Sequence, residues 1–121
     1  MKNADLLVLF EHPEWQKPLF AALERKGVRF DTLDLKHAAF VSGEPTAKLV
    51  FNQASPSAYV RDHARAVPLA LAYLKSLEGS GTPILNGARA FALELSKTAQ
   101  ASLIARLGLR TPRSLVFNDV D

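Results

Sequence analysis

A lysine stands at the position where one helix of this chain is expected to begin. Ser96 is a typical N-cap residue, and Lys97 follows it directly. A cation in the first helical turn lies at the positive end of the helix dipole and costs roughly 0.3–1 kcal/mol at an exposed site. The free amides of a helix start and a lysine can bind a phosphate together. Lys97 is therefore either a phosphate contact or an exposed lysine that salt screening makes tolerable.

Three short polar segments follow apolar segments that are expected to be strands. They are Glu11-His12, residues 53–57 and Asn86-Gly87. Ligands of parallel α/β sheets bind beyond the carboxyl ends of the strands, so these segments form the candidate binding region. The last of them is most simply a tight turn.

Several motifs of self-contained catalysis are absent from the sequence. The first expected strand is not followed by the glycines of a dinucleotide fold, and there is no phosphate loop of the Gly-x-x-x-x-Gly-Lys-Ser/Thr type. His12, His37 and His63 lie far apart and lack the spacing of metal ligands on a helix. There is no cysteine, which excludes disulfides and thiol chemistry and fits a reducing compartment. No catalytic residue and no metal site are predicted within these residues.

Length and composition are those of one soluble domain. The chain has 121 residues, of which 48% are hydrophobic and 22% charged. No apolar run approaches the ~18 residues of a membrane helix, and the first residues lack a signal-peptide pattern. The net charge of +3 is spread along the chain rather than clustered between aromatic residues. We therefore expect a cytoplasmic protein without membrane or nucleic-acid partners, in which local pairs of cations can still meet small anions.

Hydrophobic periodicity predicts an α/β fold. The expected strands are residues 6–10, 28–35, 47–52, 83–85 and 114–117, and the expected helices are residues 17–26, 59–77, 88–95 and 97–107. Strands separated by helical crossovers imply a mostly parallel sheet of four to five strands with helices on both faces.

Prolines and apolar positions add detail to the expected helices. Pro18 is expected to occupy the first position of the first helix, and Pro68 is expected to kink or split the second. The side chains expected to be buried are Val60, Val67, Leu71 and Leu74 in the second helix, and Leu103, Ile104 and Leu107 in the last.

The second half of the chain carries a series of features in a fixed order. Residues 83–117 contain a strand, an Asn-Gly turn, a short helix, Ser96-Lys97, residues 107–109 (Leu-Gly-Leu) and Pro112. This order resembles the N-terminal, Rossmann-like pre-ATP-grasp domain of ATP-grasp ligases, the superfamily of glutathione synthetase, D-alanine–D-alanine ligase and the RimK-type glutamate ligases. The resemblance covers nearly the whole chain in layout, with sharp matches from about Leu49 onward. It implies a substrate-side domain over residues 1–110, with residues 111–121 starting the strand that leads into an ATP-grasp lobe.

The resemblance also implies roles for individual residues. It makes Lys97 the contact to the phosphates of ATP, and it places substrate contacts after the first strand, where a glutamate can hold an amine and a histidine can orient a carboxylate. The alternative for the histidine is that it only stabilises the turn. The substrate-binding candidates are Glu11, His12, Asn52, Gln53, Ser55, Ser57 and Arg61.

The turn at residues 52–57 departs from the pattern Asn-Arg-x-Ser-Pro-Ser that it resembles. Gln53 stands where arginine is common, so the two-pronged grip of a guanidinium on a carboxylate is lost there. Arg61 and Arg65, one helical turn apart, either compensate by facing the same cleft or are surface cations.

Cofactors and partners follow from the same resemblance. ATP and Mg²⁺ are implied for a longer protein, in which two further lobes supply a second phosphate lysine, the adenine clamp and the magnesium ligands. We therefore expect these 121 residues to be part of a longer ligase and to be inactive alone. The implied partners are a small carboxylate or amine substrate and the missing ATP-grasp lobes. A homodimer through residues 103–120 is a further expectation, since the surface that meets those lobes would be exposed.

Two readings from other classes remain open. The first is a stand-alone Rossmann-like module that binds a ligand or a protein without catalysis. The second is a receiver-type signalling domain, which requires a phospho-acceptor aspartate after a central strand, where Asn52 and Gln53 stand.

Overall fold

The strand β1 (Ala4–Phe10) organises the fold because its apolar residues are buried on both faces. A computed structural model describes residues 4–118 of the chain. Val8 and Leu9, which point to opposite faces of the strand, are both inaccessible to solvent. β1 pairs on one side with β2 (Phe30–Asp34) and on the other with β3 (Ala47–Asn52), and both pairings are parallel. The short strand β4 (Ile84–Leu85) pairs in parallel with β3, so the sheet order is β2-β1-β3-β4.

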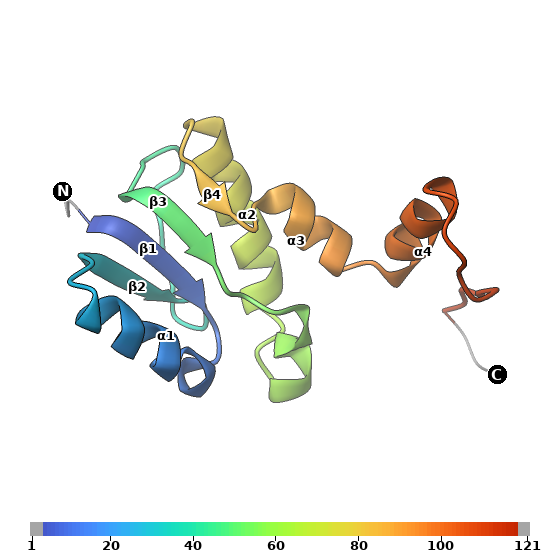
Figure 1. Cartoon of the computed structure of the whole chain (residues 1–121), viewed down its shortest axis with the longest axis horizontal. Helices are drawn as coiled ribbons and strands as arrows, with labels where there is room; N and C mark the ends of the chain where they lie inside the picture. The colour runs from blue at the N-terminus through green and yellow to red at the C-terminus, as the bar shows by residue number, and fades with distance from the viewer. Residues whose placement is uncertain (1–3, 119–121) are drawn as a thin grey trace.

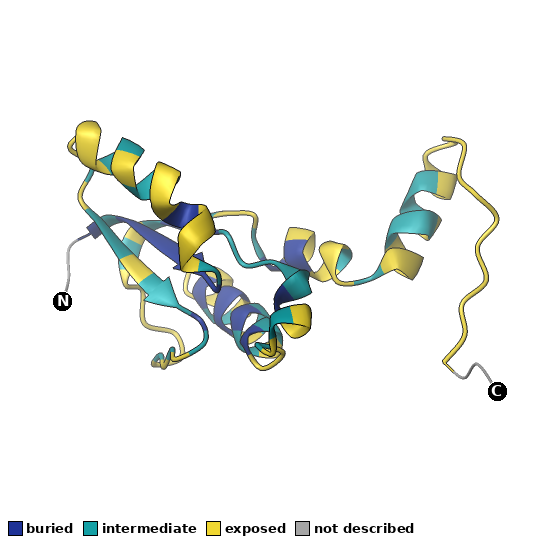
Figure 2. Ribbon diagram, turned by 90° about the horizontal axis from the view of Figure 1, so that it is seen from below, coloured by how far each residue is buried: buried dark blue, intermediate teal, exposed yellow. Residues whose placement is uncertain are grey.

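Two helices cover the two faces of the sheet. The crossover through α1 (Pro13–Arg25) leads from β1 to the β2 edge, and the crossover through α2 (Ala66–Gly79) leads from β3 to the β4 edge. Right-handed crossovers that run in opposite directions place their helices on opposite faces, and Figures 1 and 2 show this arrangement. The expected fold, a parallel α/β sheet with helices on both faces, is confirmed.

Packing differs between the two faces. On the α2 face, Leu74 and Leu77 pack in the main core with Val50 of β3 and with Phe91 of α3 (Ala88–Glu94). On the other face, Phe20 of α1 holds its helix to the sheet. Its ring centroid lies 5.7 Å from that of Phe10 and 5.6 Å from that of Phe30.

The first two helices begin and end at residues other than those expected. α1 begins at Pro13 rather than near Lys17, since a proline costs nothing at a first position, and Pro18 lies inside the helix. The expected helix 59–77 is split before Pro68, not at it. The 3-10 helix η1 (Pro56–Arg61) is followed by its C-cap Asp62, whose left-handed φ of 60° breaks the helix, and α2 begins four residues after Asp62.

Burial in the second expected helix is also partly different from the expectation. Val60 is 65% exposed because it lies on η1 and not on α2, so its expected place in the core is wrong. Leu74 is buried, and Val67 and Leu71 are half-buried against the core, as expected.

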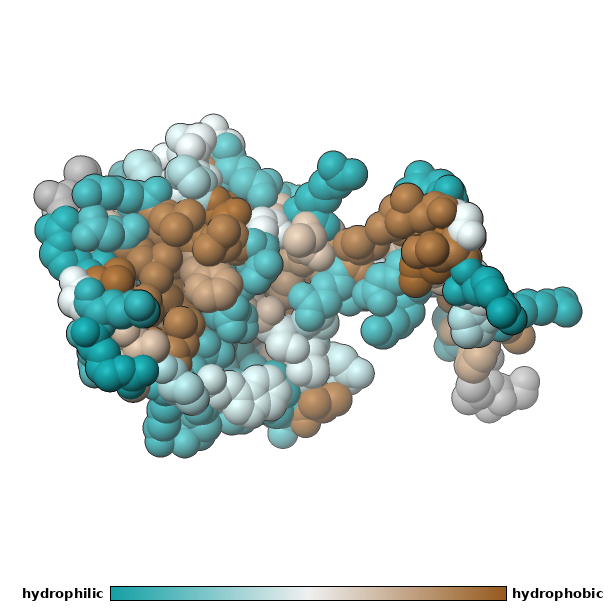
Figure 3. Space-filling view, viewed as in Figure 1, coloured by the Kyte–Doolittle hydropathy of each residue, from teal (hydrophilic) through white to brown (hydrophobic). Residues whose placement is uncertain are grey.

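The last helix, α4 (Lys97–Arg106), extends away from the sheet together with the residues that follow it (Figure 1). None of its residues is buried, and Leu107 is 64% exposed, so the expected buried stripe is only half-covered at Leu103 and Ile104. Figure 3 shows apolar side chains gathered on this outlying part.

The expected strand at 114–117 is absent from the structure. Residues 109–117 form neither helix nor strand, and Leu115 is 85% exposed. A strand needs a partner for its backbone groups, and the described part of the chain places none beside this segment. Across residues 4–118, no helix has both the length and the apolar character that a bilayer crossing requires.

Candidate functional site

A buried carboxylate marks the carboxyl end of β1. The side chain of Glu11 is 2% exposed, and its two oxygens accept hydrogen bonds from Arg61 Nε, both at 3.1 Å, and from Arg61 Nη2 at 2.6 Å. His63 Nδ1 contacts the same carboxylate. Hydrogen bonds from Arg61, and secondly from His63, lower the pKa of Glu11 to about 2 against the opposing effect of burial. Glu11 is therefore ionised and fully engaged with its own chain.

Arg61 is held on three sides. Besides Glu11, its Nη1 donates to Ser57 Oγ at 3.1 Å, and its guanidinium lies 4.7 Å from the ring centroid of Trp15. Ser57 belongs to the same 3-10 helix, one turn earlier, which explains why the two side chains meet. The paired carboxylate raises the pKa of Arg61 above its already high value. The result is a fixed cation with one face covered by an aromatic ring.

His12 completes this cluster from the N-cap position of α1. Its ring stacks on Trp15 with centroids 4.3 Å apart and planes 10° apart. Its Nδ1 atom is shielded from solvent and has no hydrogen-bond partner among residues 4–118. A buried polar atom without a partner costs about 1–3 kcal/mol, so this nitrogen is the unsatisfied polar group of the cluster.

A second group of polar residues lies where β3 and β4 end. Asn52 Nδ2 donates to the carbonyl of Asn86 and Asn86 Nδ2 donates to the carbonyl of Asn52, both at 3.1 Å. Asn52 Oδ1 also accepts the amide of Ala54 at 3.0 Å. Asn52 is 3% exposed. Through these hydrogen bonds its side chain joins the ends of β3 and β4 and shapes the turn that follows β3.

A cavity of about 330 Å³ lies beside this pair of asparagines. Gln53 and Ser55 line it from β3's end, and Phe91 and Glu94 line it from α3. Ser55 connects the cavity to the first cluster, since its Oγ lies 2.8 Å from Ser57 Oγ and caps η1 by accepting the Ser57 amide.

The structure thus brings the expected substrate-binding residues together and leaves Lys97 outside. Glu11, His12, Ser57 and Arg61 form one cluster, and Asn52, Gln53 and Ser55 form the adjoining cavity. Lys97 opens α4, where Ser96 Oγ caps the helix by accepting the Ala99 amide at 3.1 Å, as expected for the cap. The Lys97 ammonium is exposed and donates to Gln100 Oε1 at 3.4 Å.

His63 is the member of the cluster that sequence reasoning missed. It lies 52 residues from Glu11 in the chain, and the spacing of the three histidines gives no sign of the contact. The backbone turn at Asp62 directs it, since the His63 amide donates to the Ala58 carbonyl at 3.0 Å. The local feature that places His63 is the left-handed backbone of Asp62 after a short helix, and the presence of an aspartate in the sequence does not predict that conformation.

The comparisons with known proteins concern the fold. No protein-family model and no curated protein sequence matches the chain. A structure of the ATP-grasp ligase PsnB complexed with a minimal precursor matches with a TM-score of 0.64 and 21% identity, over 97% of this chain and 47% of that one. A structure of PsnB complexed with the precursor peptide PsnA2 and AMPPNP matches with a TM-score of 0.63 and 18% identity, over 95% and 48%. The chain spans about half the length of these ligase chains. At the level of fold, the resemblance expected from the sequence is confirmed: this chain has the fold of part of an ATP-grasp ligase.

Proposed function

We propose that this chain is the substrate-side part of a longer ATP-dependent ligase that joins a carboxylate to an amine or a thiol. The observation that carries the proposal is the fold, because 97% of the chain matches an ATP-grasp ligase structure with a TM-score of 0.64. The polar cluster at the carboxyl ends of the strands supports it, since parallel α/β sheets bind their ligands there.

The substrate contacts in this proposal come from groups that the fold leaves available. His12 Nδ1 has no partner among the described residues, and Gln53 lines the adjoining cavity. Gln53 can meet a substrate carboxylate or amine directly, whereas His12 Nδ1, which is shielded from solvent, can do so only when the loop around it opens. Glu11 has the role of a positioning residue, because its oxygens are occupied by Arg61 and His63. Arg61 is neutralised by Glu11, but the N–H donors that it does not use on Glu11 and Ser57 suit a substrate carboxylate better than an amine.

Lys97 is the proposed contact to the phosphates of ATP. The first-turn amides of α4 and the exposed ammonium fit a single phosphate contact. The described residues contain no group of three His, Asp or Glu side chains able to hold a metal ion, so the residues that bind Mg²⁺ belong in this proposal to the rest of the protein. When bound there, ATP would supply the phosphoryl group that activates the substrate carboxylate, and Mg²⁺ would neutralise the charge on the phosphates.

The test compares two lysines in the protein encoded by the complete reading frame. With ATP, Mg²⁺ and a carboxylate-bearing substrate, ADP release is measured against ATP concentration. A peptide is the first substrate to try, because PsnB is complexed with a precursor peptide. Lys97→Met is expected to raise the KM for ATP about tenfold, the effect of losing one charged hydrogen bond, while Lys75→Met on the exposed face of α2 leaves it unchanged.

Two outcomes would refute the proposal. One is equal kinetics of the Lys97→Met and Lys75→Met proteins, which would remove the phosphate role of Lys97. The other is ATP-dependent phosphate release at an enzyme-like rate by the 121-residue chain alone, which would remove the requirement for further lobes.

A further inference from the structure

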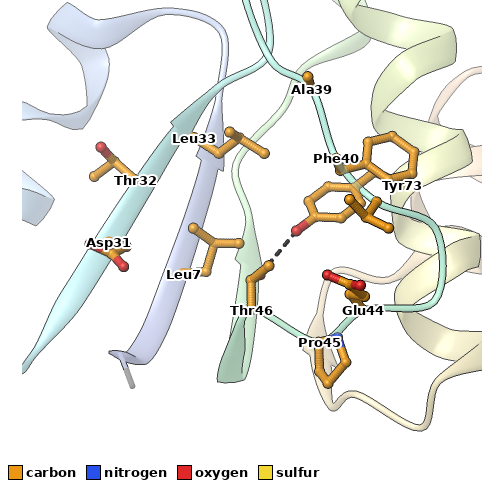
Figure 4. A pocket seen from close by; sticks show the side chains of 11 residues that line it. Leu7, Asp31, Thr32, Leu33, Ala39, Phe40, Glu44, Pro45, Thr46 and Tyr73 are labelled. Atoms are coloured by element: carbon orange, nitrogen blue, oxygen red, sulfur yellow. Dashed lines mark hydrogen bonds between the residues drawn. The ribbon is translucent and has the colours of Figure 1, made fainter. Parts of the chain in front are cut away.

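A larger cavity, of about 610 Å³, shares no lining residue with the polar cluster described above, and Figure 4 shows the side chains that line it. Its apolar lining includes Leu7 of β1 and Leu33 of β2, together with Phe40 and Tyr73. The volume falls within the range of small-molecule sites, about 300–1,000 Å³. Leu7 of β1 lies four residues before Glu11, which follows the end of the strand roughly 13 Å away, so the cavity faces the middle of the sheet and not its carboxyl edge.

The cavity exists because the connection from β2 to β3 contains no helix. In this fold a crossover helix normally covers the sheet, but here residues 35–46 cross the α2 face as an irregular segment. Phe40 anchors that segment by stacking on Tyr73 of α2, with ring centroids 4.4 Å apart. Two aromatic rings therefore form one wall of a groove whose floor is the sheet.

The charges that line the groove have one sign. Asp31 shares a face of the sheet with Leu7, its partner in the β1–β2 register, and Glu44 lies across the groove on the connecting segment. The lining contains no lysine, arginine or histidine, although the chain as a whole has a net charge of +3. Within residues 4–118, neither carboxylate has an ion pair or a side-chain hydrogen bond.

The other polar groups of the groove are already satisfied. Tyr73 Oη and Thr46 Oγ1 lie 3.0 Å apart and hydrogen-bond to each other, as Figure 4 shows. The groove thus presents an aromatic and aliphatic surface with two unpaired carboxylates at its rim. A ligand with an apolar body and a positive charge is complementary to both features.

We propose that this groove binds a small amphipathic cation, a molecule with an aromatic or branched aliphatic body and one protonated amine. The body packs against Leu33 and Phe40, behind which Tyr73 is buried, and the amine lies near Asp31 and Glu44. This site is separate from the proposed ligase site, so the failure of one proposal leaves the other standing.

The experiment uses three probes that differ in charge and share a phenyl body: 2-phenylethylamine, 2-phenylethanol and 3-phenylpropionate. Each is titrated into the ¹⁵N-labelled 121-residue chain at pH 7, and amide shifts are followed by NMR. The amine is expected to shift the amides of residues 39–46 and of Tyr73, with a Kd at least about threefold below that of the alcohol, as two partly exposed ion pairs imply. The acid is expected to bind most weakly.

Matched double variants separate local complementarity from net charge. Asp31→Asn with Glu44→Gln should abolish the preference for the amine over the alcohol. Glu24→Gln with Asp62→Asn changes the net charge equally at exposed positions outside the groove and should preserve it.

Four results would overturn the proposal. They are equal Kd values for amine and alcohol in the unmodified chain, shifts confined to residues outside the groove, loss of the preference in the control variant, and absence of shifts at millimolar amine. The three-probe ranking needs no variant, so the proposal stays testable even where a substitution impairs folding.

Discussion

Replacing Glu11 by glutamine tests whether the buried ion pair holds the polar cluster together. The substitution keeps the size of the side chain and removes its charge. Because the folded-state pKa of Glu11 is lowered from 4.5 to about 2, the ionised carboxylate stabilises the fold above pH 4.5. That contribution is lost as the pH falls through the folded-state value. The variant should therefore be less stable than the original chain at neutral pH and nearly as stable in acid.

The magnitude follows from the interval between the two pKa values. Each pKa unit corresponds to about 1.4 kcal/mol, so the interval from 4.5 to about 2 corresponds to about 3 kcal/mol. The partners are partly exposed, Arg61 at 20% and His63 at 36% of their side chains, and solvent screening reduces the effect. We expect Glu11→Gln to lower the free energy of unfolding by about 2 kcal/mol at pH 7 and by less than half of that at pH 3.

Urea unfolding at the two pH values measures this difference. Trp15 is the only tryptophan of the chain and lies on Arg61, so its fluorescence reports on the cluster directly. Asp5→Asn is the matched control. Arg29 and Lys48 lower the pKa of Asp5 to about 2 at the other end of β1, roughly 20 Å from Glu11. Because the two carboxylates are too far apart to interact, the pH-dependent losses of stability caused by Asp5→Asn and by Glu11→Gln should be additive. A destabilisation by Glu11→Gln that is the same at pH 7 and pH 3 would refute the reasoning.

Three further predictions concern packing, turn geometry and the exposed tail. Phe20→Ala should lower stability by about 2 kcal/mol, since its half-buried ring is the aromatic contact of α1 with both Phe10 and Phe30; urea unfolding measures the loss. Asn52→Ala should cost about 2–3 kcal/mol in the same assay by leaving buried groups unpaired, while Gln53→Ala costs under about 0.5 kcal/mol, and equal losses would contradict the structural role of Asn52. The 121-residue chain should self-associate through residues 103–120, where Leu115 is 85% exposed, and a chain ending at Gly108 should do so less. Light scattering that finds both chains monomeric at high concentration would contradict this.

The sequence predicted the elements whose signal is local. Residues 6–10 form a continuous apolar run, and a strand buried on both faces is the structure that such a run favours. The start of the first helix was wrong because Pro13 and Pro18 both fit a first position, and nothing local ranks them. Asn52 could be assigned to a turn but not to its reciprocal contact with Asn86, which depends on β3 and β4 being neighbours.

Residues 114–117 show where a local sequence pattern does not predict the structure. Their apolar composition favours a strand, but strand formation depends on an adjacent edge that the described residues do not place there. The predicted burial of Leu107 after the last helix was wrong for the same reason, because residues 4–118 offer no surface for it to pack on.

The parallel sheet itself explains why the candidate site could be located without its partners being known. All strands run in one direction, so the ends of β1, β3 and β4 lie along one edge, and each end carries a polar residue: Glu11, Asn52 and Asn86. That these side chains gather follows from topology alone. Which of them pair depends on η1 and the turn at Asp62, where one left-handed residue directs His63 toward Glu11. A glutamate that looks available for a substrate amine in the sequence is thereby committed to Arg61, and among residues 4–118 the buried His12 Nδ1 is the polar atom of the cluster without a partner. In the proposed ligase, substitution of His12 should therefore change substrate selectivity more than it changes the stability of the fold, whereas substitution of Glu11 should do the reverse.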